Sequence, residues 1–405
     1  MTQTRADRSA DLTSGPMLQK IILFSIPLAA SSILQLLFNA ADVVVVGRFA
    51  GSTALAAVGS NGSLINLLVN LFVGLSLGAN VVAARCFGAK DEHGIQDTVH
   101  TAVTLGLTSG VLLAVVGFFA ARSLLELMSC PEDVIDLSSL YLKIYFIGMP
   151  MNMLYNFSSA LLRAVGDTKR PLYCLAAAGV INVVLNLVFV IGFSMSVAGV
   201  ALATIISQTV SACMVTALLV KEKGPLHLDL GHLGFHAGAL GQILRIGLPG
   251  ALAACFEASL FAVTALLLAP LGKVIVAGHQ IAMNFAGMVF MLPLSLNITV
   301  AIRVGQNLGA GRLERARLSA RTALCLGLGL ALLTMTATLC LRPQIAQIYN
   351  SDPAVLGLAV GLLVFAAVNQ IPESLQTVSI GVLRAYNDTR YILGVCLFSY
   401  WIVGL

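Results

Sequence analysis

The chain has 405 residues, of which 58% are hydrophobic and only 10% are charged, and its formal net charge is +5. A soluble domain usually carries about 25% charged residues, so this composition excludes an ordinary water-soluble enzyme, and the high mean hydropathy of +0.93 excludes a disordered chain. The small basic excess fits loops at a membrane better than a nucleic-acid-binding surface. The eight cysteines show no CxxC spacing, so neither a zinc site nor a disulfide framework is indicated.

Apolar stretches long enough to cross a bilayer, which takes about 20 residues, follow one another along the chain. Residues 1–16 are polar and lack a signal-peptide core, which predicts a cytoplasmic tail. Helices are expected because only they satisfy this much backbone in lipid, and the alternating segments of a β-barrel do not occur. The predicted spans are 19–47, 54–80, 97–121, 138–160, 171–193, 195–220, 241–268, 274–300, 319–341 and 354–381. An eleventh stretch, from Tyr391 to Leu405, is too short to cross comfortably.

The distribution of Lys and Arg predicts the orientation. With the N-terminus inside, the inner loops and tail hold 18 of these residues and the outer loops hold five. Inner loops of membrane proteins carry the basic excess, so we expect a multi-pass plasma-membrane or inner-membrane protein with a cytoplasmic N-terminus.

The sequence repeats itself. LLRAVGDTKRP at 161–171 is echoed by VLRAYNDTRYI at 382–392, and Pro27 is echoed at nearly the same spacing by Pro249. Six spans per repeat give both halves one direction, which predicts an all-α membrane protein of two parallel six-helix lobes, related by a pseudo-two-fold axis along the membrane normal. The expected parts are an N-terminal lobe at 17–220, a cytoplasmic linker at 221–240 and an incomplete C-terminal lobe at 241–405. The spacing of the repeat predicts that the last one to two helices are missing.

Three acidic residues lie inside predicted spans: Asp42, Glu257 and Glu373. An embedded carboxylate costs about 2.5–3.5 kcal/mol on insertion scales, so three would cost roughly 8–10 kcal/mol, comparable to the stability of a domain. We therefore expect these carboxylates to bind a cation or proton in a central cavity. A structural reading, in which Asn39 or Arg48 pairs with the carboxylate, stays open most for Asp42.

Amide side chains accompany these acids along the helices. These side chains either line a cavity for the ion and substrate or form hydrogen bonds between helices. The sequence favours neither interpretation over the other. The candidates for the cavity are Gln35, Asn39, Asn182, Gln280 and Asn284, with Asn369 at the cation site. Prolines inside spans bend helices, so Pro27, Pro249 and Pro372 are predicted hinges.

Two enzymatic alternatives carry less weight. The sequence Gly74-Leu-Ser-Leu-Gly78 matches GxSxG, but the hydrolase elbow needs a strand–turn–helix, whereas this segment lies in an apolar helix. An intramembrane serine protease would pair Ser76 with His279, and it stays a remote alternative. No GxxxxGK[ST] motif occurs, so ATP does not drive this chain directly. We therefore expect no enzyme, no cofactor and no stable metal site.

Several segments together resemble the MATE (multidrug and toxic compound extrusion) family of transporters: LQLLFNAADVVVVGRFAG, LLRAVGDTKRP and GHQIAMNF. The first lobe resembles the DinF-like branch of that family, and the second resembles the NorM branch. The resemblance implies a secondary antiporter that exports cationic or amphipathic drugs in exchange for H⁺ or Na⁺ by alternating access. The partners it implies are small-molecule drugs and membrane lipid, without nucleic acid, and the expected state is a monomer.

The resemblance also implies roles for particular residues. The family's first-span aspartate falls on Asp42 and its seventh-span glutamate falls on Glu257. The tenth-span pair of a tyrosine and, four residues later, an aspartate reads Asn369 and Glu373 here. Loss of the tyrosine favours protons over Na⁺, although transient Na⁺ at the two glutamates stays possible. The alternative within the superfamily is a lipid-linked glycan flippase, which needs Lys and Arg in its cavity for pyrophosphate; basic residues lie only near the span ends.

Overall fold

The computed structural model describes residues 15–128 and 130–404, and this part of the chain is helical without strands. Residues 1–14 of the predicted tail lie outside the described residues. The helices of the N-terminal half are α2 (Met17–Val45), α3 (Ser52–Ala89), α4 (Glu92–Leu127), α5 (Glu132–Ile147), α6 (Met149–Ala164), α7 (Lys169–Leu187) and α8 (Ser196–Lys221). Those of the C-terminal half are α9 (Ala237–Leu268), α10 (Lys273–Gly309), α11 (Leu313–Tyr349), α12 (Pro353–Ala385) and α13 (Thr389–Leu397). Short π-helical turns extend three of them: η1 (Val46–Ala50), η2 (Val188–Gly192) and η5 (Phe398–Val403).

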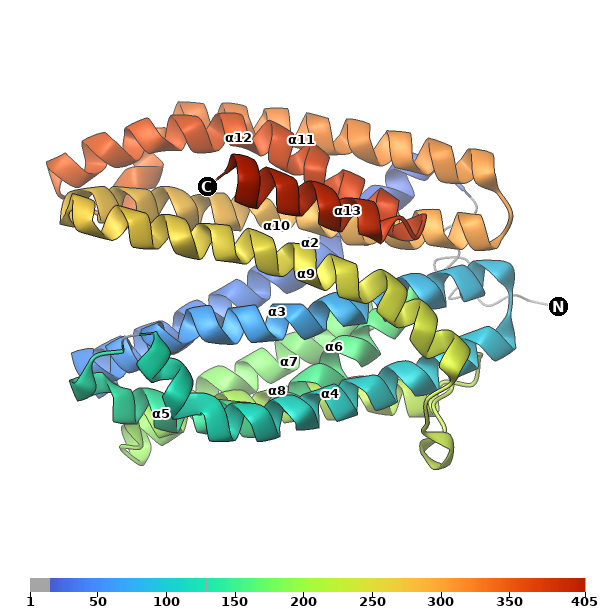
Figure 1. Ribbon diagram of the computed structural model, residues 1–405, viewed down its shortest axis with the longest axis horizontal. Coiled ribbons are helices and arrows are strands. Elements are labelled where there is room, and N and C mark those ends of the chain that lie inside the picture. Colours follow the sequence, from blue (N-terminus) through green and yellow to red (C-terminus); the bar gives the residue numbers. More distant parts are fainter. Residues whose placement is uncertain (1–14, 129, 405) are drawn as a thin grey trace.

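The helices form two groups that meet along one seam. Helices α2 to α8 form one lobe, and α9 to α13 form the other. In Figure 1 most of the first lobe lies below the second. Nine of the described helices are long and apolar enough to cross a bilayer. The protein is therefore an all-α, multi-pass membrane protein, as the composition predicts.

The internal repeat is visible in the backbone. Three turns with a positive φ in the first lobe recur at the equivalent positions of the second: Gly51 and Gly272, Lys90 and Gly311, and Gly166 and Asn387. A corresponding helix contact also recurs, because Asn80 on α3 donates to the carbonyl of Ala160 on α6, and Asn297 on α10 donates to the carbonyl of Thr377 on α12. Equivalent turns and corresponding helix contacts show that the sequence repeat is a structural repeat.

The fourth predicted span is not a single helix. Residues 138–160 fall on α5 and α6, which meet at Gly148 with a bend of 48°. Pro150 lies in the first turn of α6, where its missing N–H and its fixed φ are tolerated, so the break falls where proline can start a new helix. Pro27, Pro249 and Pro372 each lie inside one continuous helix.

Helices extend beyond the apolar stretches that predict them. α10 continues to Gly309, so Arg303, which the hydropathy places in a loop, is buried in the last turns of this helix and donates to Ser319 Oγ at 3.2 Å. Arg384 near the end of α12 donates to Asn297 Oδ1 at 3.2 Å. Similarly, α9 begins at Ala237, inside the predicted linker. Hydropathy detects only the apolar part of a helix. The helix itself continues through polar residues that are buried against other helices.

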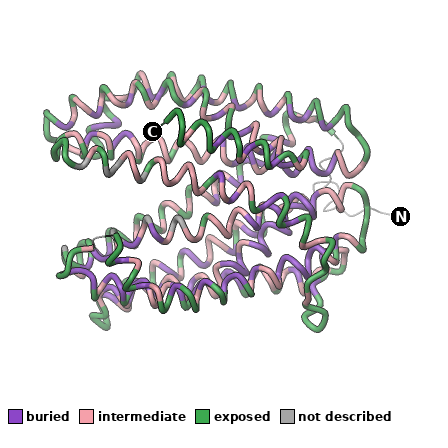
Figure 2. The backbone as a smooth tube through the Cα atoms, in the orientation of Figure 1, coloured by how far each residue is buried: buried purple, intermediate pink, exposed green. Residues whose placement is uncertain are grey.

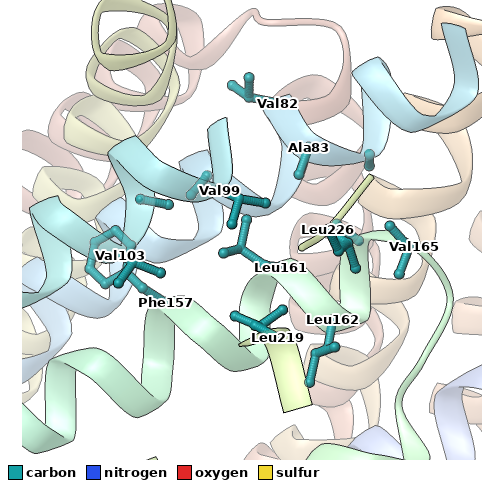
Figure 3. Close-up of a cluster of buried hydrophobic side chains, with 14 of the residues drawn as sticks. Val82, Ala83, Val99, Val103, Phe157, Leu161, Leu162, Val165, Leu219 and Leu226 are labelled. Carbon is teal, nitrogen blue, oxygen red and sulfur yellow. The ribbon is translucent and has the colours of Figure 1, made fainter. Parts of the chain in front are cut away.

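The largest hydrophobic core lies mainly in the first lobe and also includes Ile243 and Ile246 of α9 and Ala301 and Ile302 of α10. Val99 and Val103 of α4, Phe157 and Leu161 of α6 and Leu226 of the linker meet in it (Figure 3). Buried residues are concentrated inside this lobe and along the seam between the lobes (Figure 2). Replacing a fully buried Phe such as Phe157 by Ala typically lowers the free energy of unfolding by about 3–5 kcal/mol. Because Leu226 packs in the same core, the core also holds the linker against the first lobe.

The seam between the lobes is built from small residues. On α3, Gly74 contacts Ala251 of α9, and Gly78 lies against the backbone of Gly247. Near the end of α3, an added Cβ on Gly88 would overlap the carbonyl oxygen of Gln306 on α10. Glycine lets two helix backbones approach this closely in a membrane, which explains the GxSxG sequence as a packing motif.

Polar side chains reinforce the same end of the seam. Gln306 Nε2 donates to the carbonyl of Ala164 at 2.7 Å, and Arg85 Nη2 donates to the carbonyl of Ala385 at 2.6 Å. Both bonds connect the two lobes. They hold the lobes closed together at the end of the molecule that carries the start of α2 and the linker between the lobes (Figure 1).

Candidate functional site

Asp42 is at the centre of a polar site inside the first lobe. It lies near the end of α2 and is only 8% exposed. The carboxylate accepts a hydrogen bond from Asn186 Nδ2 on α7, and Thr204 of α8 interacts with the same carboxylate. Asn186 also donates to Asn182 Oδ1 at 3.2 Å. We call Asp42, Asn182, Asn186 and Thr204 the N-lobe site.

The N-lobe site has an oxygen atom without a partner. Asn186 Oδ1 is fully buried and accepts no hydrogen bond within the described structure. Buried polar atoms are nearly always satisfied, so an unpaired carbonyl oxygen beside a carboxylate suits a small cation or a water molecule. Arg48 forms no ion pair with Asp42 among the described residues, so the fixed basic partner that would make Asp42 structural is not seen.

Two tyrosines border the N-lobe site. Tyr141 and Tyr145 of α5 stack with their ring centroids 6.1 Å apart, and both lie within electrostatic range of Asp42. Gln208 of α8 interacts with the hydroxyl of Tyr145. The broken α5–α6 span therefore supplies aromatic rings next to the carboxylate.

The two embedded glutamates lie in the same region of the second lobe. Glu257 on α9 and Glu373 on α12 are half-buried and lie within electrostatic range of each other. Tyr400 of η5 lies near both carboxylates, and its hydroxyl accepts a hydrogen bond from Gln376 of α12. We call Glu257, Glu373, Gln376 and Tyr400 the C-lobe site. The three embedded acids thus form two sites, one in each lobe, because the partners of Asp42 come from α7 and α8, whereas those of Glu257 come from α12 and η5.

Two cavities adjoin the C-lobe site. One of about 10 Å³ is lined by Glu373 together with Gln370 and Thr334, and it is of the size that holds one water. Another of about 180 Å³ lies between α12 and α13 and is lined by Gln376 and Tyr400. The glutamates form no ion pair with a basic residue in the described part of the chain, so their charge is available to a ligand.

The predicted cavity amides divide into two groups. Asn182 is buried in the N-lobe site. The others are exposed on their helices: Gln35, Asn39, Gln280, Asn284 and Asn369. Asn284 donates to the carbonyl of Gln280, one turn earlier. Asn369 makes no hydrogen bond among the described residues, whereas its neighbour Gln370 is buried and donates to Thr338 Oγ1 at 3.1 Å.

Several site residues escape sequence reasoning. Tyr400 lies in the short last stretch. Tyr141 and Tyr145 lie in a segment whose composition is that of an ordinary apolar helix. Thr204 and Gln376 are single polar residues without a repeated pattern. Asn186 lies one turn after the predicted cavity residue Asn182, and this i, i+4 spacing of two amides in an apolar helix is the signal by which Asn186 could be found.

Known proteins are similar to this chain over most of its length. The MatE family model matches residues 27–188 and 249–405, which fall on the two lobes separately. The probable multidrug resistance protein NorM of Shewanella oneidensis is 34% identical over 402 residues, covering 97% of this chain and 86% of that protein. The multidrug resistance protein PmpM of Pseudomonas aeruginosa is 33% identical over 395 residues, covering 96% and 82% respectively.

Solved structures agree with the fold. A multidrug resistance MATE family transporter of the MOP superfamily in an outward-facing conformation superposes with a TM-score of 0.90 at 22% identity, covering 99% of this chain and 89% of that one. A MOP superfamily transporter from Pyrococcus furiosus gives the same TM-score, identity and coverage. Since the family model covers both lobes and the relatives match almost end to end, this chain belongs to the MatE family.

Proposed function

We propose that this protein exports cationic or amphipathic drugs in exchange for H⁺ or Na⁺ by alternating access. The observation that carries the proposal is the pair Glu257 and Glu373, two carboxylates that lie near each other among membrane-spanning helices without a basic partner in the described part of the chain. Two adjacent negative charges in an apolar region repel strongly, so a bound cation or a shared proton stabilises the pair. The multidrug resistance relatives NorM and PmpM support drugs as the other ligand.

Exchange follows from competition for these carboxylates. A drug cation and the coupling ion each neutralise the pair, and together they would bring two positive charges into one low-dielectric site, so each weakens binding of the other. One inward proton at 100 mV supplies about 2.3 kcal/mol, which sustains roughly a 50-fold drug gradient when the drug carries no opposing charge.

The exposed amides support a substrate cavity between the lobes. Gln35 and Asn39 on α2 and Gln280 and Asn284 on α10 are exposed one turn apart on their helices. An amide that faced lipid would lose its hydrogen bonds to water at a cost of several kcal/mol. We therefore assign them to the water-filled space between the lobes, where they meet the drug.

We propose that the N-lobe site is a second binding site for the coupling ion. Asp42→Asn should lower efflux about tenfold, because it removes the one charge beside the unpaired oxygen of Asn186. Transport of a fluorescent cation in proteoliposomes measures this, with Asp136→Asn as the control, since Asp136 is exposed and pairs with Arg122. Equal rates in the two variants would remove Asp42 from the mechanism.

The coupling ion is decided by imposing one gradient at a time. Efflux is measured with a Na⁺ gradient at fixed pH and with a pH gradient in the absence of Na⁺. We expect the pH gradient to suffice, since the acid of the tenth span is a glutamate and the tyrosine of the NorM branch is replaced by Asn369. A strict requirement for Na⁺ would overturn this assignment.

The flippase alternative receives no support from the basic residues. Arg303 and Arg384, which are buried, hydrogen-bond to Ser319 and Asn297 near the seam. They lie at the ends of α10 and α12, where they stabilise helix packing, and no arginine adjoins the C-lobe site among its described neighbours. We further propose that the N-terminus is cytoplasmic, that the membrane is the inner membrane and that the transporter acts as a monomer.

A further inference from the structure

A groove runs between the two lobes on the outside of the helix bundle. It has a volume of about 520 Å³ and lies between α2 of the first lobe and α10 and α11 of the second. Its walls are apolar: Ile22 and Ile26 from α2, Leu292 and Leu296 from α10, and Leu326 and Leu330 from α11. Ile26 is 57% exposed, so the groove opens outwards rather than into a closed core.

The few polar atoms in the groove are already satisfied. Ser25 Oγ bonds to Thr299 Oγ1 at 2.8 Å, Ser295 Oγ donates to the carbonyl of Leu292 at 2.7 Å, and Thr322 Oγ1 donates to the carbonyl of Leu318 at 2.9 Å. None of these hydroxyls therefore needs a partner from a ligand. A hydrocarbon chain fits such a groove better than a polar drug does.

The length of the groove matches one leaflet of a bilayer. Its lining runs from Leu18 to Ala29 along α2 and from Thr322 to Leu333 along α11, about 16 Å at the helical rise of 1.5 Å per residue. The apolar segment of α11 between Arg321 and Arg342 has the length that crosses the hydrocarbon core of a bilayer. The groove occupies the half of that span next to Arg321, on the side where the lobes are closed.

The mouth of the groove is basic. Arg321 is exposed and lies one turn before Cys325, which lines the groove, so the two share a face of α11. The preceding turns carry three more arginines, Arg312, Arg315 and Arg317, and a single acid, Glu314, which pairs with Arg317 at 3.0 Å. This excess of positive charge at the membrane surface attracts anionic lipid headgroups.

We propose that this groove binds an anionic phospholipid of the leaflet on the N-terminal side, with one acyl chain in the groove and the phosphate at Arg321. The lipid contacts both lobes at once, because α2 belongs to one lobe and α10 and α11 belong to the other. A movement of the lobes changes the width of the groove, so a lipid that fits this conformation stabilises it over others. The groove shares Leu292 and Leu330 with the small cavity that Glu373 lines, but none of the three carboxylates lines the groove itself. The proposal does not depend on the proposed transport.

The test is photo-crosslinking in phosphatidylcholine nanodiscs with a trace of phosphatidylglycerol that carries a diazirine in its acyl chain. Groove segments of α2 and α11 should be labelled more strongly than lipid-facing residues of α4, such as Phe119, which is 80% exposed. Gly329→Phe should reduce groove labelling to the α4 level, because a side chain at Gly329 meets open space inside the groove. Gly357→Phe on α12, also in open space but outside the groove, is the matched control.

The headgroup is tested independently of the groove-filling variant. Arg321→Gln should lower the preference for photoreactive phosphatidylglycerol over photoreactive phosphatidylcholine about fivefold, whereas Arg342→Gln, beyond the other end of the apolar segment, should leave it unchanged. Equal labelling by the two lipids in the unmodified protein, labelling spread evenly over α4 and the groove, or unaltered labelling in folded Gly329→Phe would each overturn the proposal.

Discussion

Replacing Glu257 by Gln is expected to reduce drug efflux at least about tenfold while leaving the protein folded in the membrane. The amide keeps the volume of the side chain but removes the charge that Glu373 and Tyr400 surround. Typical coupling free energies between two ligands correspond to about 5- to 150-fold in affinity, and loss of the shared group removes this coupling. Efflux of a fluorescent cation from energised everted vesicles measures the effect.

Glu373→Gln is expected to have the same effect, and the double variant should be little worse than either single one. Residues that act as one unit are strongly non-additive. Glu126→Gln is the matched control, since Glu126 is an exposed residue at the end of α4 that pairs with Arg122. Unchanged efflux in either single variant would remove that glutamate from the mechanism, and strictly additive losses would show that the two carboxylates act separately.

Adding a methyl group at the seam is expected to open the closed end of the protein. In Gly88→Ala the new Cβ would overlap the carbonyl oxygen of Gln306, and in Gly309→Ala it would overlap that of Arg85. Both oxygens belong to the backbone, which cannot rotate away as a side chain does. The conformation with this end closed should therefore become less populated, and drug efflux should fall with it, because the proposed alternating access requires both conformations.

The distance between spin labels at Glu92 and Leu313, which lie at this end on the two lobes, measures the opening. It should lengthen in Gly88→Ala and Gly309→Ala. Gly305→Ala is the control from one turn earlier on α10, where the nearest atom would be Ala84 Cβ at an ordinary contact distance of 3.5 Å. A distance distribution that is the same in all three variants would show that the glycines do not hold the lobes together.

The membrane class, the helix order and the repeat were predictable because each depends on local composition. A run of about 20 apolar residues is helical in lipid whatever its neighbours are, and turns such as Gly166 and Asn387 need a residue that tolerates positive φ wherever they occur. The helix ends were less predictable. The hydropathy of the segment around Arg303 is that of a loop, although the residue is buried in α10.

The site was predictable in part. A carboxylate within an apolar span is costly wherever it points, so Asp42, Glu257 and Glu373 could be selected by sequence. Their neighbours could not, because Tyr400 and Gln376 gain a role only when α13 lies against α9 and α12. Asn369 illustrates the reverse case, since its spacing from Glu373 suggests a site residue although it makes no hydrogen bond in the described structure.

The sequence by itself therefore determined that this is a two-fold repeated bundle of membrane helices with three embedded carboxylates, because insertion into lipid is governed by the chemistry of each segment. Only the tertiary structure decided that Asp42 pairs with Asn186 in one lobe while Glu257 lies within electrostatic range of Glu373 in the other. It also decided which glycines close the seam and that α2, α10 and α11 leave an apolar groove between them. Contacts between helices far apart in the chain depend on the shapes of both surfaces, and that information is not contained in either segment alone.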